Sequence, residues 1–144
     1  MIGVMPTFPP LTHYALTVSD LDRSIAWYEE LFGAPPFFVG DESTYRFAVW
    51  LEQKIGLHQH FAISGSEPFD ELRPGLDHFA FGCANRDELV EWSERLEELG
   101  IEHGEIVDAF YGSGLAFRDP DNIQLEFFWR APSGRDDLSV RPDQ

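Results

Sequence analysis

The feature that most constrains the fold of this chain is an internal repeat, in which one motif occurs twice at a fixed offset. Three pairs of identical residues are separated by the same 65 positions: His13 and His78, Asp22 and Asp87, and Trp27 and Trp92. Each copy begins with an apolar segment, continues through a polar turn into an amphipathic segment, and ends at a glycine. Three coincidences at one offset, in matching elements, predict a duplicated module.

The first segment of each copy alternates between apolar and other residues, as expected for a strand with one buried face. In the first copy Tyr14, Leu16 and Val18 share one face, and His13, Ala15 and Thr17 share the other. In the second copy Phe79, Phe81 and Cys83 oppose His78, Ala80 and Gly82. We expect a helix to cover the apolar face. The small residues on the other face leave room for a cavity beside each histidine.

A helix is predicted after each of these strands. In the first copy Ser19 or Asp20 is the expected N-cap and Gly33 the end. Its apolar stripe consists of Leu21, Ile25, Tyr28, Leu31 and Phe32. In the second copy Asn85, with Glu88 three residues later, resembles a capping box, and Gly100 ends the helix.

Further strands are expected after each helix. They are 45–51 and 55–61 in the first copy, and 114–118 and 123–129 in the second, where Asp119-Pro120-Asp121-Asn122 has the composition of a hairpin turn. The predicted fold class is therefore α+β, with two tandem β-α-β-β-β modules in one domain over residues 11–130. Module one spans 11–63 and module two 75–130, with a linker at 64–74. Residues 1–10 and 131–144, which taken together are rich in Pro, Ser, Asp and Arg, are predicted to be mobile segments.

Composition excludes several classes of function. The chain of 144 residues has a formal net charge of −16, which repels phosphate backbones and argues against nucleic-acid binding. Its single cysteine, Cys83, excludes an intrachain disulfide and any site that needs several cysteines; we expect a buried, inert thiol. Neither a signal peptide nor a membrane-spanning segment is recognisable, so we expect no membrane association and a soluble cytoplasmic protein.

The candidate metal ligands are His13, His78 and Glu126. The two histidines occupy the same position in equivalent strands, on the face that is not apolar. Glu126 lies between Leu125 and Phe127, where a carboxylate would lose several kcal/mol of hydration unless it is paired or bound to a metal. The alternative is a purely structural salt bridge from Glu126 to Arg118.

Other residues are candidates for the same site. Aligning Leu57 with Leu125 places His58 in the position that corresponds to Glu126, and His60 shares its parity. Tyr111 and Arg118 are further candidates for a substrate pocket, and Arg118 has an alternative role as the partner of a surface acid. Alternating residues of the 45–51 strand should also line the pocket, but its pattern does not decide which. His103 lies in a polar stretch and is predicted to be on the surface.

These segments resemble the vicinal oxygen chelate superfamily, which includes glyoxalase I, extradiol dioxygenases, and fosfomycin and bleomycin resistance proteins. The resemblance spans residues 11 to 129. It is carried by THYALTVSDLDRSIAWYEELFG, GLDHFAFGCANRDELVEWSERLEELGI and FRDPDNIQLEFF. It implies a glyoxalase-like fold in which the modules form a cupped mixed sheet with the helices on its outer face. It also implies metal ligands at His13, His78 and Glu126, with His58 in a fourth position.

The resemblance implies an enzyme that binds one divalent metal ion (Fe, Mn, Ni, Co or Zn) and a small substrate with two adjacent oxygens. Glyoxalase I generally carries a glutamate in the fourth position, whereas this chain has His58 there. Extradiol dioxygenases place a catalytic histidine near it, so His58 is either a ligand or an acid–base group. Their tyrosine before the final hairpin corresponds to Ala116. Both a dioxygenase-like and a glyoxalase- or lyase-like reaction therefore stay open, with Glu126 and His58 as the catalytic candidates.

Two alternatives to an enzyme follow from the same resemblance. One is a binding protein like the bleomycin resistance proteins, which hold a cationic small molecule without a metal; the acidity of the chain is compatible with it. The other is a protein that kept the fold and lost the chemistry. A homodimer is expected in each case, because open sheet edges favour pairing with a second chain.

Overall fold

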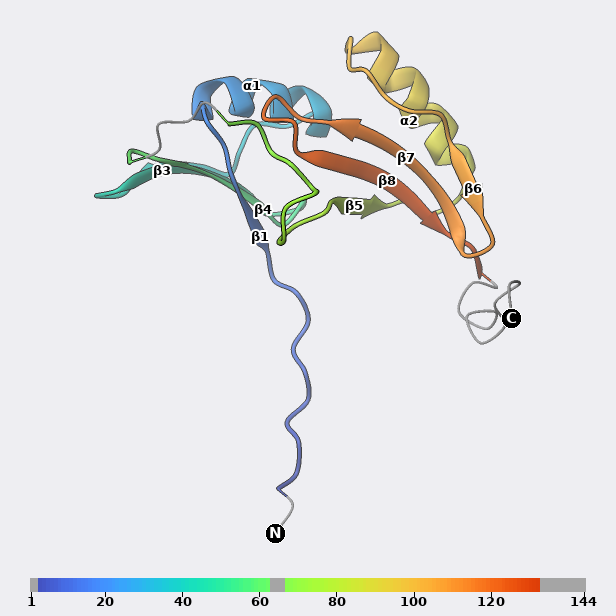
Figure 1. Ribbon diagram of the computed structural model, residues 1–144, viewed down its shortest axis with the longest axis horizontal. Coiled ribbons are helices and arrows are strands. Elements are labelled where there is room, and N and C mark those ends of the chain that lie inside the picture. Colours follow the sequence, from blue (N-terminus) through green and yellow to red (C-terminus); the bar gives the residue numbers. More distant parts are fainter. Residues whose placement is uncertain (1–2, 63–66, 133–144) are drawn as a thin grey trace. The chain divides into compact units, whose positions relative to one another are not determined.

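The computed structural model describes residues 3–62 and 67–132. The chain divides into two compact units, Met1–Gly65 (unit 1) and Ser66–Gln144 (unit 2). Each unit contains one four-stranded mixed sheet and one helix (Figure 1). The predicted α+β class and the repeated β-α-β-β-β order are therefore confirmed.

Both units have the same sheet topology. The elements of unit 1 are β1 (Tyr14–Thr17), α1 (Leu21–Phe32), β2 (Phe38–Asp41), β3 (Tyr45–Trp50) and β4 (Ile55–His60). Those of unit 2 are β5 (Phe79–Gly82), α2 (Asp87–Glu98), β6 (Val107–Ala109), β7 (Gly112–Arg118) and β8 (Gln124–Arg130). The strand orders are β1-β4-β3-β2 and β5-β8-β7-β6, and the first strand of each unit runs parallel to the last. The sequence repeat thus corresponds to a structural repeat.

Helix α1 begins and ends where its sequence predicts. The side chain of Asp20 accepts a hydrogen bond from the backbone N–H of Arg23, and Gly33 adopts a left-handed conformation with φ 70°. Gln59 on β4 adds a second cap, because its Oε1 accepts from the N–H of Leu21 at 2.7 Å. This bond ties the start of the helix to the sheet that it covers.

Helix α2 is capped by a reciprocal pair. Asn85 Oδ1 accepts from the N–H of Glu88 at 3.0 Å, and Glu88 Oε2 accepts from the N–H of Ala84 at 2.8 Å. This confirms the predicted capping pair, with the return bond reaching Ala84 rather than Asn85 itself. Gly100 follows the helix with φ 71°, as a stop of this kind requires.

The core of each unit lies between its helix and the apolar face of its sheet. In unit 1 it comprises Leu16, Val18, Leu21, Tyr28, Leu31, Ala48, Trp50, Ile55 and Leu57. In unit 2 it comprises Leu89, Leu96, Leu115, Phe117, Ile123, Leu125 and Phe127. The alternation in β1, β4 and β8 therefore indicates the buried face correctly. Phe61, which the pattern of β4 places with this face, is instead 55% exposed, because β4 ends at His60.

Two short strands, β2 and β6, were not located by their sequence. Both lie at the edge of their sheets, and neither shows a clear apolar alternation. The hairpin between β7 and β8 agrees with its sequence: Asn122 has φ 67°. Asp119 Oδ1 accepts from the N–H groups of Asp121 and Ile123 and so stabilises the turn.

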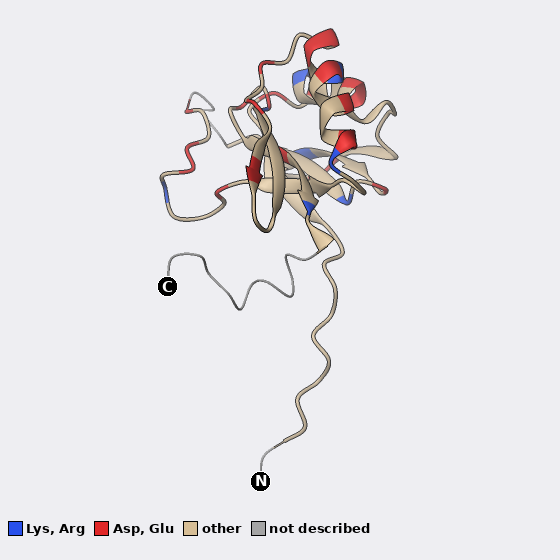
Figure 2. Cartoon of the chain, turned by 90° about the vertical axis from the view of Figure 1, so that its right-hand side faces the viewer, with Lys and Arg blue, Asp and Glu red and all other residues tan. Residues whose placement is uncertain are grey.

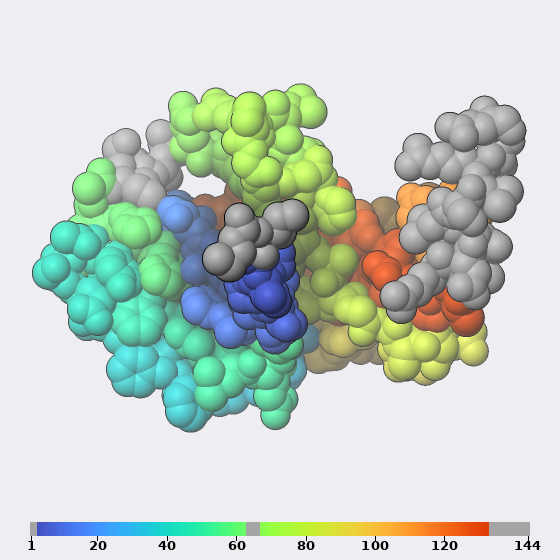
Figure 3. Space-filling model, turned by 90° about the horizontal axis from the view of Figure 1, so that it is seen from below, coloured from blue at the N-terminus to red at the C-terminus, as the bar shows by residue number. Residues whose placement is uncertain are grey.

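The segment before β1 is apolar and uncharged. Residues 3–13 carry no regular secondary structure, and residues 3–11 extend away from the sheet of unit 1 (Figure 1). Figure 3 shows the same segment end-on, and Figure 2 shows no charged residue in it. Val4, Met5 and Phe8 are 97%, 85% and 93% exposed. The C-terminal segment predicted to be mobile lies outside the described residues from 133 onward. Within the described ranges, neither 12-residue helix has the length and apolarity that a bilayer crossing needs.

The packing of β8 against α2 predicts the effect of a truncated core residue. Leu125 is fully buried, so Leu125→Ala should lower the free energy of unfolding by about 2–5 kcal/mol through lost burial and a residual cavity. Urea titration followed by circular dichroism measures this change. Leu72→Ala is the matched control, because Leu72 is 89% exposed; an equal loss in both variants would contradict the described core.

Candidate functional site

In unit 1 three histidines lie on the face of the sheet that the helix does not cover. Strand pairing sets Thr17 beside His58 and Ala15 beside Gly56, which places His13, His58 and His60 on one face by alternation. The imidazole of His58 is stacked on the ring of Tyr45, with ring centroids 4.9 Å apart and planes 18° apart. His60 lies beside the same tyrosine at 5.6 Å.

A cavity of about 360 Å³ opens on this face. It is lined by Thr12, His13, Ala15, Tyr45, Phe47, Val49, Trp50, Leu51, Lys54, Gly56 and His58. Three of the β3 residues in this lining, Tyr45, Phe47 and Val49, share one face of the strand, a choice that its sequence left open. Trp50 also borders the cavity but is only 2% exposed and belongs to the core. Lys54, which no sequence pattern singled out, is a cation at the same cavity.

The environment of His58 favours a neutral imidazole. Partial burial lowers the pKa of His58 below its ordinary value, and the charges of His60 and His13 lower it further. A neutral imidazole next to Tyr45 and Phe47 can accept a proton at physiological pH. The arrangement therefore suits an acid–base group better than a permanently charged one.

In unit 2 the equivalent face carries His78 and Glu126. Ala80 of β5 and Ala116 of β7 are the direct neighbours of Glu126 on β8, one on each side. Gly114 lies below the carboxylate: a Cβ atom at Gly114 would approach Glu126 Oε1 to 3.0 Å. Small residues thus surround the acidic side chain and give it room on this face.

Glu126 is half-buried without a polar partner among the described residues. Burial raises the pKa of Glu126 above its ordinary value, and the nearby His78 lowers it in part. The predicted alternative, a salt bridge to Arg118, is wrong. Arg118 donates instead to both carboxylate oxygens of Glu71, at 2.6 and 2.9 Å, and to Gln124.

The pairing with Arg118 also changes the interpretation of that residue. Hydrogen bonds from Arg118 hold the pKa of Glu71 at about 2, so the two form a stable ion pair. A further bond, from the Nδ2 group of Asn122 to the carbonyl of Phe69, ties the same segment to the β7–β8 turn. Arg118 therefore fastens residues 69–73 to the hairpin, which corresponds to the surface-acid role among its predicted alternatives.

Strand register corrects the predicted equivalence of His58 and Glu126. Tyr14 pairs with Ile55 in unit 1, and Phe79 pairs with Leu125 in unit 2. Because Tyr14 and Phe79 are equivalent in the repeat, the residue that corresponds to Glu126 is Gly56. His58 lies two residues further along the same face. Alternation cannot detect this error, since a shift by two residues leaves every side chain on its original face.

The remaining candidates have different surroundings. Tyr111, between β6 and β7, is stacked on Phe128 with a centroid distance of 6.2 Å, and Phe128 shares the face of Glu126. His103, predicted to be on the surface, lines an open hollow, where its side chain is partly covered and 13% exposed. Its Nδ1 lies 2.7 Å from the carbonyl oxygen of Gly104, and its Nε2 lies 3.6 Å from Glu97 Oε1 on α2.

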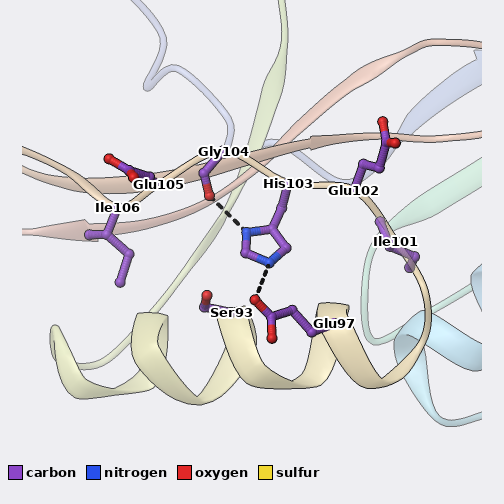
Figure 4. Close-up of a pocket in the computed structure, with 8 residues that line it drawn as sticks. All are labelled: Ser93, Glu97, Ile101, Glu102, His103, Gly104, Glu105 and Ile106. Atoms are coloured by element: carbon purple, nitrogen blue, oxygen red, sulfur yellow. Dashed lines mark hydrogen bonds and ion pairs between the residues drawn. The ribbon is translucent and has the colours of Figure 1, made fainter.

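Figure 4 shows the hollow that contains His103, which lies between α2 and the segment 101–106. The ring of His103 lies between the Gly104 carbonyl and Glu97. Glu102 and Glu105 point away from the ring, and both ring nitrogens of His103 are engaged. We interpret it as a structural contact that holds the loop after α2 on the helix. Cys83, the single cysteine, is half-buried, and burial raises its pKa to about 11, which makes the thiol a poor nucleophile.

Each unit taken by itself contains no complete metal centre. Among its described residues, no group of three or more His, Cys, Asp or Glu side chains is arranged to hold a metal ion. Unit 1 offers His13 with His58 nearby, and unit 2 offers His78 with Glu126. The predicted ligands are thus divided between the two units.

Comparison with known proteins identifies relatives over most of the chain. The model of the Glyoxalase/Bleomycin resistance protein/Dioxygenase superfamily matches residues 11–127. A metallothiol transferase FosB of Lysinibacillus sphaericus is 30% identical over 123 residues, which cover 84% of this chain and 82% of the relative. A trivalent organoarsenical cleaving enzyme of Bacillus sp. (strain MD1) is 31% identical, over 81% of this chain and 71% of the relative.

A solved structure supports the same assignment. The crystal structure of a glyoxylase/bleomycin resistance protein/dioxygenase domain from Frankia sp. EAN1pec has a TM-score of 0.78 and 36% sequence identity to this chain. The match covers 87% of this chain and 100% of that domain. The fold and the sequence therefore point to the same group of proteins.

The raised pKa of Glu126 predicts a gain in stability when its charge is removed. At pH 7 the carboxylate of Glu126 is ionised in the unfolded chain. Burial in the folded, metal-free protein disfavours the ionised form, so the charge lowers the free energy of unfolding. Glu126→Gln should therefore raise Tm at pH 7. The gain should vanish below the ordinary carboxyl value of 4.5, where both states are protonated.

Thermal unfolding at pH 7 and at pH 3.5, with a chelator present, measures this difference. Glu91→Gln on the exposed face of α2 is the matched control, since it removes the same charge without changing a half-buried site. A lower Tm for Glu126→Gln at pH 7 would show that the carboxylate has a stabilising partner instead.

Proposed function

Because the chain belongs to the Glyoxalase/Bleomycin resistance protein/Dioxygenase superfamily, we propose that it is a metal-dependent enzyme of the vicinal oxygen chelate type. Its substrate is a small molecule that binds the metal through two adjacent oxygens. The ligands are His13, His78 and Glu126. The observation that carries the proposal is the half-buried carboxylate of Glu126, which lacks a described partner, faces away from the core and lies near His78.

The donor set fits a divalent transition metal. Two imidazoles and one carboxylate are the ligands of the 2-His-1-carboxylate type of site, which leaves coordination positions open. Fe(II), Mn(II), Ni(II), Co(II) and Zn(II) all accept these donors. Gly56 supports such an open site, because the position equivalent to Glu126 in unit 1 carries no side chain that could act as a fourth ligand.

The bound ion would act as a Lewis acid that stabilises negative charge on the substrate oxygens. The protein residues have separate tasks. Tyr45, Phe47 and Val49 form an apolar wall that limits the access of water to the cavity of unit 1. Lys54 offers a positive charge at the same cavity for an anionic group.

We assign to His58 the role of the acid–base group rather than of a fourth ligand. It lies two residues beyond Gly56 on the same face, which is too far along the strand to be the equivalent of Glu126. Its lowered pKa keeps the imidazole neutral at physiological pH, ready to accept a proton. His60 contacts the same tyrosine but is not among the residues that line the cavity.

The names of the relatives describe thiol transfer and the cleavage of organoarsenicals, which are unlike reactions. We therefore take the reaction class from the site itself. A neutral imidazole beside a metal with three protein ligands can transfer a proton in each of the reactions considered, whether the enzyme is a lyase, an isomerase or a dioxygenase. The metal and the acid–base group are the shared requirement of these reactions.

A metal-binding measurement tests the proposal. The wild-type chain, purified without an affinity tag, should bind one divalent ion per chain, measured by elemental analysis and by titration with Co(II). His78→Ala should lower the affinity at least about 10-fold, because it removes one of three ligands. His103→Gln is the matched control, since that imidazole lies outside the proposed centre.

The outcome that contradicts an enzyme is a wild-type chain that binds no metal, or a His78→Ala variant that binds it equally well. Binding of a cationic glycopeptide by the metal-free protein would then favour the binding-protein alternative. The net charge of −16 supports that alternative, whereas the histidine and glutamate ligands do not require it.

A homodimer is the second part of the proposal. The uncharged segment 3–11 carries exposed apolar side chains in a strongly acidic chain, so it can contact a second copy without like-charge repulsion. Phe8→Asp should therefore shift the protein from dimer to monomer in light scattering coupled to size exclusion. Leu72→Asp, at another exposed leucine, is the control. A wild-type monomer, or an unchanged dimer of Phe8→Asp, would contradict this role of the segment.

A further inference from the structure

The residue before each candidate histidine ligand contacts the same nitrogen of its ring. In unit 1, Thr12 Oγ1 lies 2.9 Å from His13 Nδ1. In unit 2, Asp77 Oδ1 lies 2.6 Å from His78 Nδ1. Thr12 and Asp77 are separated by the same 65 positions as the two histidines, so the contact is repeated with the module.

We propose that Thr12 and Asp77 are positioning residues that hold the Nδ1 atoms of His13 and His78 and leave both Nε2 atoms free to bind the metal. The inference rests on the proposed metal centre. It goes beyond it by assigning a nitrogen to each ligand and a partner to each ring. The atoms that make these contacts are Thr12 Oγ1 and Asp77 Oδ1.

The two contacts have different chemical consequences. An ionised carboxylate only accepts hydrogen bonds, so Asp77 requires the proton of His78 to be on Nδ1 and leaves a lone pair on Nε2. The hydroxyl of Thr12 can donate or accept, and by itself it allows either tautomer of His13. The tautomer of His78 is therefore set before a metal binds, whereas that of His13 is set when the metal occupies Nε2.

The contacts also differ in strength. A hydrogen bond to a carboxylate is shorter and stronger than one between neutral groups, in agreement with 2.6 Å against 2.9 Å. A carboxylate behind a ligand imidazole also makes the imidazole a better donor to the metal. Because the Asp77 side chain is 69% exposed, water screens part of this effect. We therefore expect the loss of Asp77 to reduce metal affinity by about 10-fold, at the low end of such outer partners.

Two readouts test the proposal. The first is the ¹⁵N chemical shifts of the histidine rings in the metal-free full chain above pH 7.5, which distinguish a proton on Nδ1 from one on Nε2. Wild type should show His78 as the Nδ1–H tautomer, and Asp77→Ala should show a mixture. The second is Co(II) affinity by calorimetry, which should fall about 10-fold in Asp77→Ala and by a smaller factor in Thr12→Val.

Conservative variants separate the role of position from that of charge. Asp77→Asn keeps a carbonyl oxygen that accepts from Nδ1–H, so it should retain the tautomer and lose only part of the affinity. Thr12→Ser should behave as wild type. Glu105→Gln, which removes one exposed charge elsewhere in unit 2, should change neither readout.

The proposal is overturned if Asp77→Ala and Asp77→Asn both bind Co(II) as tightly as wild type, or if the ring of His78 in the wild type carries its proton on Nε2. Failure of the proposed function gives a different result, in which the wild-type chain itself binds no Co(II). Asp77→Asn keeps the test valid if the alanine variant does not fold.

Discussion

The structure depends on a difference between the two faces of each sheet: one face packs in the hydrophobic core, and the other carries the candidate functional residues. In β1, β4 and β8 alternate apolar side chains lie in the core of their unit, and the burial of these residues fixes the register of the strands. A slip by one residue would place imidazoles and a carboxylate in the core, at a cost of several kcal/mol for the charged group. The hydrophobic core therefore determines where the residues of the opposite face lie, although it does not touch them.

This constraint explains how much the sequence alone could predict. Alternation and caps are local signals, and they located both helices, the long strands and the faces of His13, His58, His78 and Glu126. The short edge strands β2 and β6 carry no such signal, because few of their side chains are buried. The equivalence of Gly56 and Glu126 depends on pairing between strands that are distant in sequence. The partner of Arg118 is Glu71, which lies in a segment without hydrophobic periodicity and therefore could not be predicted.

Charged groups on the sheet face that the helix does not cover differ from charged groups elsewhere in whether they have a polar partner. Arg86 with Asp108, and Arg118 with Glu71, are paired at hydrogen-bond distance. Glu126, in contrast, is half-buried beside alanine and glycine, with its pKa raised by burial, and His58 has its pKa lowered for the same reason. An acid with a raised pKa and a base with a lowered pKa, both on sheet faces outside the core, are expected of a ligand-binding site rather than of a structural network of ion pairs.

The glycine at position 56 illustrates a wider consequence of building a protein from a doubled module. Two copies that fold by the same rules need not carry the same groups on the face that packing leaves alone, since helix and core constrain only the other face. One half can then lose a side chain while its twin keeps one. Substitutions on that face leave the packing of helix and core intact, so one scaffold can carry unlike chemistry in its two halves.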